Sequence, residues 1–412
     1  MADKKSKKAV VTPKKALKKA APAKAKPAKK AAPPKAKPAA AKSKVIFFTG
    51  FPGFIGKRLV RQLLEKDAGT RFLMLTQEKF LELAKKAVDD LTAEVPAAKT
   101  NVELLVGDLT VDGFGFDKAT KARLNRDVTE VWHLAAVYDL AVPEKIAWQI
   151  NVEGTRRMLD LCEGLPKLDK FVYVSTCYVA GLRTGLVVEE DLDCGQGFKN
   201  NYESTKFEAE VLVRKRMDKI PTIIIRPSVV VGDSRTGETD KYDGPYFVVR
   251  FFADLDRRNI LGKIKGWRLP SLGKGEAYFN TVPVNYLVDA MCHIVENPKA
   301  IGKTFQIADP DPCTMRELYD IIGEAFGLGK TWGVIPLPVI RAITRAPKLG
   351  PFVGMPEQGL AYIDHYAVFD CQNTLEFLKD SNIRCPSARE YTPRMVEYTR
   401  QHMSQKGMRA KY

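Results

Sequence analysis

The sequence predicts an α/β fold with a doubly wound parallel sheet, a smaller C-terminal domain and a disordered N-terminal tail. Three observations support this prediction. Short apolar runs alternate with helical patterns along most of the chain, the first run leads directly into a glycine-rich turn, and residues 1–44 are mostly Lys, Ala and Pro. Continuous apolar runs are typical of strands that are buried on both faces of a parallel sheet.

The N-terminal tail, residues 1–44, holds most of the charge of the chain. It contains sixteen Lys and one acid, Asp3, and so carries +15 of the formal +17, which leaves +2 for residues 45–412. Its side chains are charged or small, Pro interrupts any helix and like charges repel, so we expect disorder. The tail would bind nucleic acid or an anionic membrane surface non-specifically, or it would only keep the chain in solution.

The first predicted strand, residues 45–49 (VIFFT), leads into a turn that contains three glycines. A helix follows, because the apolar residues among 55–64 fall on one face. Glycines at such a turn let the backbone bend and let a pyrophosphate approach the helix N-terminus, as in the dinucleotide-binding folds of the Rossmann type. The residues expected to contact a dinucleotide here are Gly50, Phe51, Gly53, Phe54, Ile55 and Gly56.

The end of the next predicted strand, residues 71–75 (RFLML), bears on which dinucleotide binds. In NAD-binding folds an acid at this strand end takes the ribose hydroxyls, but here Thr76 and Gln77 follow the strand. Lys79 could meet a 2′-phosphate, which favours NADP as the cofactor. Glu78 keeps NAD possible.

The third and fourth predicted strands also end in residues that suit the cofactor. The stretch VELLVGDLT contains Asp108, which is placed to hold an adenine amino group, followed by Leu109. The stretch EVWHLAAVYD contains Ala135 and Ala136, whose small side chains would let the dinucleotide lie against the backbone. We expect all four residues to bind the cofactor.

A further predicted strand and the helix after it carry the groups suited to proton transfer. The strand in residues 171–181 ends in the hydroxyls of Ser175 and Thr176, and the following helix carries Tyr202 and Lys206 on one face. An ammonium near a phenol lowers the phenol's pKa from about 10 toward the working range. Such a Tyr could exchange a proton with a substrate oxygen that a strand-end hydroxyl holds in place.

With these residues the chain, from 45 to about 400, resembles the extended short-chain dehydrogenase/reductases. The matching residues are Gly50, Gly53, Gly56, Asp108, the stretch HLAA, Asn151 in INVEGT, Thr176, Tyr202 and Lys206. The resemblance implies that Tyr202 is the acid/base and that Lys206 binds the nicotinamide ribose and tunes the Tyr. It implies that Thr176 orients the substrate oxygen, with Ser175 as the next-best alignment. Asn151 would hold a proton-relay water, or it would be a helix-interior residue that bonds the backbone.

Two further stretches, residues 223–246 and 278–291, resemble the subgroup of fatty acyl-CoA reductases and of the thioester-reductase domains of carboxylic acid reductases and peptide synthetases. In the first stretch we expect Pro227 and Ser228 to contact the cofactor, and the loop over 232–244 to cover a substrate. Asn285 stands where an Asp is usual. The chain also shows no carrier-protein or adenylation domain and no membrane-seeking C-terminal segment, so the acyl donor stays open.

We therefore expect a dinucleotide-binding Rossmann domain over 45–227 and a substrate-binding part over 228–405, interleaved with returning Rossmann elements. Arg226 ends a predicted strand and would either meet a ligand or form a structural ion pair. Cys177 should point away from its neighbour Thr176, and His133 should be a packed, hydrogen-bonded residue of a buried strand.

The distribution of Cys and His indicates whether a metal site or disulfides are expected. The seven Cys are scattered without metal-ligand spacing, and the four His form no cluster, so we expect no metal site and no disulfides. No apolar run approaches the length of a membrane span. A cytoplasmic enzyme is the favoured interpretation, and nothing in the sequence indicates its oligomeric state.

The function that we expect is an NAD(P)H-dependent reductase acting on an acyl thioester, bound to CoA or a carrier, or on the derived aldehyde. A sterol, 3-oxoacyl or nucleotide-sugar dehydrogenase or epimerase on the same scaffold is the main alternative. A third possibility is a dinucleotide-sensing protein without catalytic activity that uses the tail to bind nucleic acid.

Overall fold

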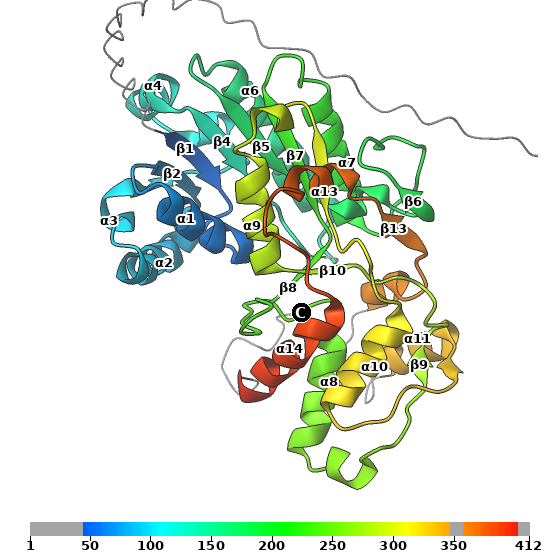
Figure 1. Cartoon of the computed structure of the whole chain (residues 1–412). Helices are drawn as coiled ribbons and strands as arrows, with labels where there is room; N and C mark the ends of the chain where they lie inside the picture. The colour runs from blue at the N-terminus through cyan, green and yellow to red at the C-terminus, as the bar shows by residue number, and fades with distance from the viewer. Residues whose placement is uncertain (1–43, 140, 347–356, 403–412) are drawn as a thin grey trace, which may run out of the picture. The chain divides into compact units, whose positions relative to one another are not determined.

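The computed structural model describes residues 44–139, 141–346 and 357–402 (Figure 1). The predicted tail over 1–44 lies outside the described residues except for Lys44. The centre of the fold is a parallel sheet of seven strands in the order β11-β7-β5-β4-β1-β2-β3. Its strands are β1 (Val45–Thr49), β2 (Arg71–Thr76), β3 (Val102–Val106), β4 (Glu130–His133), β5 (Lys170–Val174), β7 (Thr222–Pro227) and β11 (Thr304–Ile307).

Helices cover both faces of this sheet because side chains alternate along each buried strand. In β1, Ile46 and Phe48 pack with helices α1, α2, α9 and α13, whereas Phe47 packs on the other face with α4, α6 and α7. The helices of the two layers are α1 (Phe54–Lys66), α2 (Leu81–Glu94), α9 (Val284–Ile294), α13 (Gln372–Leu378), α4 (Lys118–Asp127), α6 (Gly154–Glu163) and α7 (Asn201–Arg214). The predicted doubly wound parallel sheet is confirmed.

A second hydrophobic cluster lies in the C-terminal half of the chain, away from the sheet. It joins Val249 and Phe252 of α8 (Tyr246–Arg257) to Leu318 and Ile322 of α10 (Met315–Ala325). Further elements of this half are α11 (Leu337–Arg345), α14 (Ala388–His402) and β9 (Ser271–Leu272), which are drawn in the lower part of Figure 1, and β12 (Val334–Ile335). The smaller C-terminal part therefore has a core of its own.

Short strand pairs connect this half to the sheet region. Residues Thr281–Pro283 (β10) pair with Val229–Val231 (β8), and Ala367–Phe369 (β13) pair with Gly185–Val187 (β6). Two short α-helices are α3 (Ala98–Asn101) and α5 (Glu144–Ala147), a π-helix spans Trp148–Glu153, and short 3-10 helices occur in several loops. The fourth and fifth strands end earlier than their apolar patterns, at His133 and Val174, which leaves the residues after them in loops at the carboxyl edge.

Candidate functional site

The glycine turn after β1 is packed so closely that side chains are excluded from it. Gly50 has φ +95°, and a Cβ there would lie 2.9 Å from Leu134 Cβ. A Cβ on Gly53 or Gly56 would lie 2.7 or 2.6 Å from the Gly50 carbonyl oxygen. Gly53 caps α1 without a side-chain hydrogen bond, so the first N–H groups of this helix remain available to an anion.

The carboxyl ends of β2 and β3 form the next part of the site. Asp108 accepts hydrogen bonds from Thr110 N at 2.7 Å and from Gln77 Nε2 at 2.9 Å. Burial alone would raise the pKa of Asp108, but these hydrogen bonds outweigh it and the pKa lies below its usual value. Thr76 Oγ1 is buried and has no hydrogen-bond partner among the described residues, and Lys79 is exposed.

The remaining predicted cofactor contacts lie mainly in the residues that follow β4 and β7. Ala135 N donates to Thr49 Oγ1 at 3.1 Å, which holds the segment containing Ala135 and Ala136 against β1. Ser228 is only 6% exposed, and its Oγ has no hydrogen-bond partner among the described residues. The other predicted contacts are also at the carboxyl edge or in the glycine turn, with Phe51, Phe54 and Leu109 buried, Ile55 partly buried and Pro227 ending β7.

These observations fit a nicotinamide dinucleotide. The glycine cradle admits a pyrophosphate against the N-terminus of α1. The unpartnered hydroxyls of Thr76 and Ser228 are buried polar groups at strand ends, where the nucleotide of such folds lies. Thr76 was not among the expected contacts, although its place at the end of the second apolar run could have suggested it.

Tyr202, the predicted acid/base, and Thr176, the predicted orienting hydroxyl, lie close together at the carboxyl end of β5. Tyr202 lies in the first turn of α7 and is 9% exposed. Burial raises the pKa of Tyr202 above its usual value, and a hydrogen bond with the Thr176 hydroxyl partly counteracts this. The ring of Tyr138 packs edge-on against Tyr202 with centroids 4.9 Å apart. Tyr138 was missed because its segment was expected to be strand.

Lys206 lies one turn after Tyr202 on the same helix, and the expected tuning of the Tyr202 phenol by its ammonium stays a prediction. Lys206 Nζ donates to Tyr173 Oη at 2.9 Å and to the Val174 carbonyl at 2.8 Å. Burial lowers the pKa of Lys206 to about 7. The spacing places Lys206 on the face of Tyr202, but buried acceptors on β5 decide where its ammonium points.

Asn151 lies in the π-helix and is 1% exposed. Its Oδ1 accepts from Val137 N at 2.9 Å, and its Nδ2 donates to Thr205 Oγ1 at 3.0 Å. Thr205 adjoins Lys206, so Asn151 ties the loop after β4 to helix α7. These contacts match the backbone-bonding alternative for Asn151, and its role in a proton relay stays a prediction.

Arg226 and Ser175 belong to a buried structural network rather than to a ligand site. The Arg226 guanidinium contacts the Glu210 carboxylate at 2.6 Å, and both side chains are fully buried. Ser175 Oγ donates to the same carboxylate at 2.6 Å. The Thr176 hydroxyl donates to the Pro227 carbonyl at 3.4 Å, and of the two hydroxyls it is the one that interacts with Tyr202.

Two other buried residues lie near this network. The expectation of a packed, hydrogen-bonded His133 is confirmed, whereas the direction expected for Cys177 stays a prediction, because Cys177 begins a 3-10 helix and does not continue the strand. Cys177 is buried and its Sγ contacts the Arg226 carbonyl oxygen at 3.1 Å, and burial raises its thiol pKa well above the usual range. His133 is buried between the hydroxyls of Thr49 and Thr155, at 2.8 and 3.1 Å. Burial, with a contribution from Lys206, lowers the pKa of His133 to about 3, so His133 stays neutral.

The loop over 232–244 reaches both the glycine turn and the Tyr202 region. Near the start of α1, Lys57 contacts Asp240 at 2.8 Å and Arg58 contacts Glu238 at 3.1 Å. Further along the loop, Lys241 Nζ lies 4.0 Å from the centre of the Tyr138 ring. The loop thus connects the cofactor cradle to the ring that packs on Tyr202.

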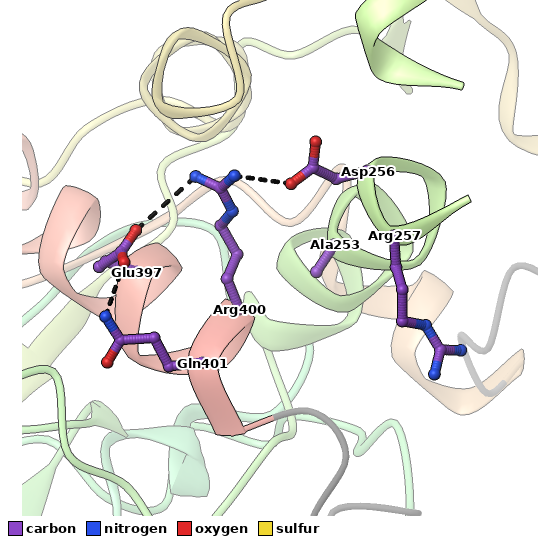
Figure 2. A pocket seen from close by; sticks show the side chains of 6 residues that line it. All are labelled: Ala253, Asp256, Arg257, Glu397, Arg400 and Gln401. Atoms are coloured by element: carbon purple, nitrogen blue, oxygen red, sulfur yellow. Dashed lines mark hydrogen bonds and ion pairs between the residues drawn. The ribbon is translucent and has the colours of Figure 1, made fainter. Parts of the chain in front are cut away.

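Figure 2 shows a pocket elsewhere, between α8 and α14. In it, Arg400 pairs with Asp256 at 2.7 Å and with Glu397 at 3.6 Å, so its charges are matched internally. None of the predicted site residues lines it. Among the residues that the structure describes, no group of three or more His, Cys, Asp or Glu could hold a metal ion, and no helix has the length and apolarity to span a membrane.

Comparison with known families now decides the class of the chain. A model of the NAD-binding family described as "Male sterility protein" matches residues 48–291. The chain belongs to this family. The match spans the glycine turn, Thr176, Tyr202 and Lys206. It confirms the predicted type, an extended short-chain dehydrogenase/reductase of the oxidoreductase class with a nicotinamide dinucleotide cofactor.

Curated relatives of the male sterility family are similar over parts of their length. The chain is 26% identical over 245 residues to the fatty acyl-CoA reductase wat of Drosophila melanogaster, which covers 50% of this chain and 47% of that protein. It is 27% identical over 284 residues to the nonribosomal peptide synthetase asaC of Aspergillus flavus, covering 65% and 26%. Another Drosophila melanogaster relative, CG8303, is 28% identical over 329 residues, and the match covers 68% of this chain and 58% of that protein.

Solved structures agree on the fold. The terminal R domain from the myxalamid PKS-NRPS pathway superposes with a TM-score of 0.73 at 22% identity, covering 90% of this chain and 94% of that one. The UDP-glucuronic acid 4-epimerase from Bacillus cereus, solved with NAD, gives a TM-score of 0.60 at 19% identity, covering 87% and 99%. Reductase domains and epimerases therefore share this architecture, and the fold alone does not choose between their reactions.

Proposed function

We propose that this member of the male sterility family is an NADPH-dependent reductase of an acyl thioester, carried on CoA or on a carrier protein, or of the derived aldehyde. The observation that carries the proposal is that Tyr202, at the start of α7, and Thr176, just after β5, lie close together at the sheet edge that also holds the glycine turn. The match of residues 48–291 to the family, and relatives named as a fatty acyl-CoA reductase and a peptide synthetase, support the substrate class.

The proposed chemistry uses the residues as follows. When bound, the nicotinamide supplies a hydride to the carbonyl carbon. Thr176 donates a hydrogen bond to the carbonyl oxygen and fixes its position, and Tyr202 transfers its proton to the same oxygen as negative charge develops. The resulting hemithioacetal loses its hydroxyl proton and expels the thiol, which leaves an aldehyde. A second round on the aldehyde would give the alcohol.

Lys206 supports this chemistry in the proposal by holding the nicotinamide ribose. Two of its ammonium hydrogens are used by Tyr173 and Val174, which fixes the direction of the third donor. NADP is the proposed form of the cofactor. The exposed cation of Lys79 follows β2, where a 2′-phosphate would lie, and no acid directly ends that strand.

We test the proposal by following NADPH oxidation and free-thiol release together, with acyl-CoAs of increasing chain length. One thiol is expected for each NADPH oxidised where reduction stops at the aldehyde, and one thiol for every two NADPH where the aldehyde is reduced to the alcohol. NADPH oxidation with ketones or aldehydes but no thiol from any thioester would favour the sterol, 3-oxoacyl or sugar alternative. Cofactor binding without turnover would favour the non-catalytic alternative, in which the basic tail binds nucleic acid.

A matched pair of tyrosine variants tests the proposed acid. Tyr202→Phe should abolish turnover and leave cofactor affinity within a few-fold. Tyr319→Phe is the control, because Tyr319 is also buried and its hydroxyl has no hydrogen-bond partner among the described residues. Full activity in Tyr202→Phe would refute the mechanism.

The tail and the location of the protein are part of the same proposal. We place the reductase in the cytoplasm, because all seven cysteines are free thiols in the structure. Residues 1–44 would contact nucleic acid or an anionic membrane, and their removal should leave turnover unchanged.

A further inference from the structure

Two segments of the C-terminal half are strongly basic and contain no carboxylate. Residues 257–275 hold six Lys and Arg, and residues 328–346 hold three, with no Asp or Glu in either. The net charge of residues 45–412 is only +2, so with +9 in these two segments the rest of this range carries −7, and its basic residues are concentrated here. The segments lie outside the site described above.

The fold brings the two segments side by side. β9 and β12 pair in parallel, with Ser271 opposite Val334. Ahead of this pairing, Gly329 N donates to the Trp267 carbonyl at 2.9 Å. The indole of Trp332 donates to the Arg268 carbonyl at 2.7 Å. Trp267 and Trp332 therefore stand on neighbouring backbones.

Both tryptophans project into solvent. Trp267 is 60% exposed and Trp332 is 58% exposed. Smaller apolar side chains on the same two segments are also exposed, namely Ile260, Val334 and Val339. Isolated exposed apolar residues are common on proteins, but the two indoles stand on paired backbones and form a patch, and three more exposed aliphatic side chains lie on the same two segments, which favours contact with another apolar phase.

The cations around this patch are available. Lys263, Lys265 and Lys330 are exposed, and none lies within ion-pair distance of a carboxylate in residues 44–139, 141–346 or 357–402. Each thus keeps its full charge for an external anion. We call the surface formed by these three lysines, Trp267 and Trp332 the tryptophan rim.

We propose that the tryptophan rim is a peripheral docking surface for an anionic lipid bilayer. Indole rings prefer the boundary between headgroups and acyl chains, and clustered lysines are attracted by anionic headgroups. A nucleic acid would use the cations and could stack on the indoles, but it offers no apolar phase to Ile260, Val334 and Val339. The lipid interpretation therefore accounts for more of the exposed side chains. It does not depend on the proposed reductase activity.

The experiment uses the full chain and vesicles of phosphatidylcholine, with or without phosphatidylserine, containing brominated lipid as a quencher. We expect quenching and a blue shift of tryptophan fluorescence only with the anionic vesicles. Quenching should be lost in Trp267→Ala/Trp332→Ala, although Trp132 and Trp148 remain. This readout separates the rim from the basic tail, because attachment through the tail alone would sediment the protein with vesicles without burying indoles.

Charge is tested by two matched triple variants. Lys263→Gln/Lys265→Gln/Lys330→Gln should weaken vesicle binding, read by quenching, by more than about tenfold. The control triple, K99Q/K118Q/K145Q, removes three exposed lysines from the other half of the chain and should leave quenching unchanged.

Three results would overturn the proposal. The first is sedimentation with anionic vesicles without quenching, which would assign binding to the tail. The second is equal weakening by both triple variants. The third is a fluorescence change with a single-stranded oligonucleotide but not with vesicles, which would make the rim a nucleic-acid surface. Turnover on a soluble acyl-CoA should be unchanged in all rim variants, which distinguishes failure here from failure of the proposed reductase.

Discussion

Adjacent hydroxyls at the end of β5 are expected to have opposite roles, and single alanine substitutions should separate them. Ser175 Oγ donates to the buried Glu210 carboxylate at 2.6 Å. Thr176 hydrogen-bonds Tyr202 and also accepts from Tyr178 N at 3.3 Å. We therefore predict that the Ser175 hydroxyl stabilises the fold and that the Thr176 hydroxyl orients the reacting oxygen.

The magnitudes follow from these contacts. A hydrogen bond to a buried charge contributes about 1.5–3 kcal/mol, so Ser175→Ala should lower the free energy of unfolding by about that amount. Glu210 keeps its ion pair with Arg226, so the network should survive. Loss of one donor to a developing oxyanion costs about 10²–10³ in kcat, so Thr176→Ala should lose this much activity. Its loss of stability should be only about 1 kcal/mol, typical of a helix cap.

Both variants are measured by urea unfolding and by kcat and KM for NADPH oxidation with one acyl-CoA. The expected pattern is a crossed one, in which Ser175→Ala is less stable and nearly fully active, and Thr176→Ala is nearly as stable as the parent and almost inactive. If Ser175→Ala lost activity to the same extent as Thr176→Ala while remaining stable, Ser175 would be the orienting hydroxyl and the assignment would be refuted.

Three further predictions concern the cradle and the buried lysine. Gly56→Ala places a Cβ 2.6 Å from the Gly50 carbonyl oxygen, so it should weaken cofactor binding and destabilise the fold by about 1–3 kcal/mol. Dinucleotide titration and urea unfolding measure the two effects. An unchanged affinity would contradict the role of the glycine turn in cofactor binding. Tyr173→Phe removes an acceptor of Lys206 and should raise KM for the cofactor more than it lowers kcat, whereas an unchanged KM would show that Tyr173 does not position Lys206. Burial lowers the pKa of Lys206 from 10.5 to about 7, so the unfolded state binds more protons than the folded state between these pH values. The free energy of unfolding, relative to that of Lys206→Met, should therefore rise with pH across this window by up to about 1.4 kcal/mol per pH unit. Parallel curves of unfolding free energy against pH for the two proteins would contradict this prediction.

The parts of the site that the sequence predicts well are those in which one residue type is required by the backbone. Gly50 has a positive φ and a neighbour at 2.9 Å from any Cβ, so only glycine suits its place. The strands are equally predictable, since residues 45–49 and 71–76 are buried almost throughout and must be apolar on both faces.

The parts that could not be predicted depend on partners from distant segments. The sequence left Arg226 open between a ligand contact and an ion pair, and the decision rests on Glu210, which another element brings beside it. The spacing of Tyr202 and Lys206 shows that they share a helix face, but the direction of the ammonium is set by Tyr173 on β5. The contact of Tyr138 with Tyr202 could not be predicted, because β4 ends at His133 and this end is set by pairing in the sheet and not by local composition.

The edge strand β11 has a consequence for how the chain is made. β11 pairs with β7 in parallel, from Thr304 opposite Ile224 to Ile307 opposite Pro227. The family match ends at residue 291, before β11. A chain cut at that boundary, or one still being synthesised on the ribosome, would present the outer edge of β7 unpaired, and its isoleucine-rich backbone would be open to pairing with another copy. A fragment that folds with the edge of β7 paired must therefore extend beyond residues 48–291, the part of the chain that matches the family.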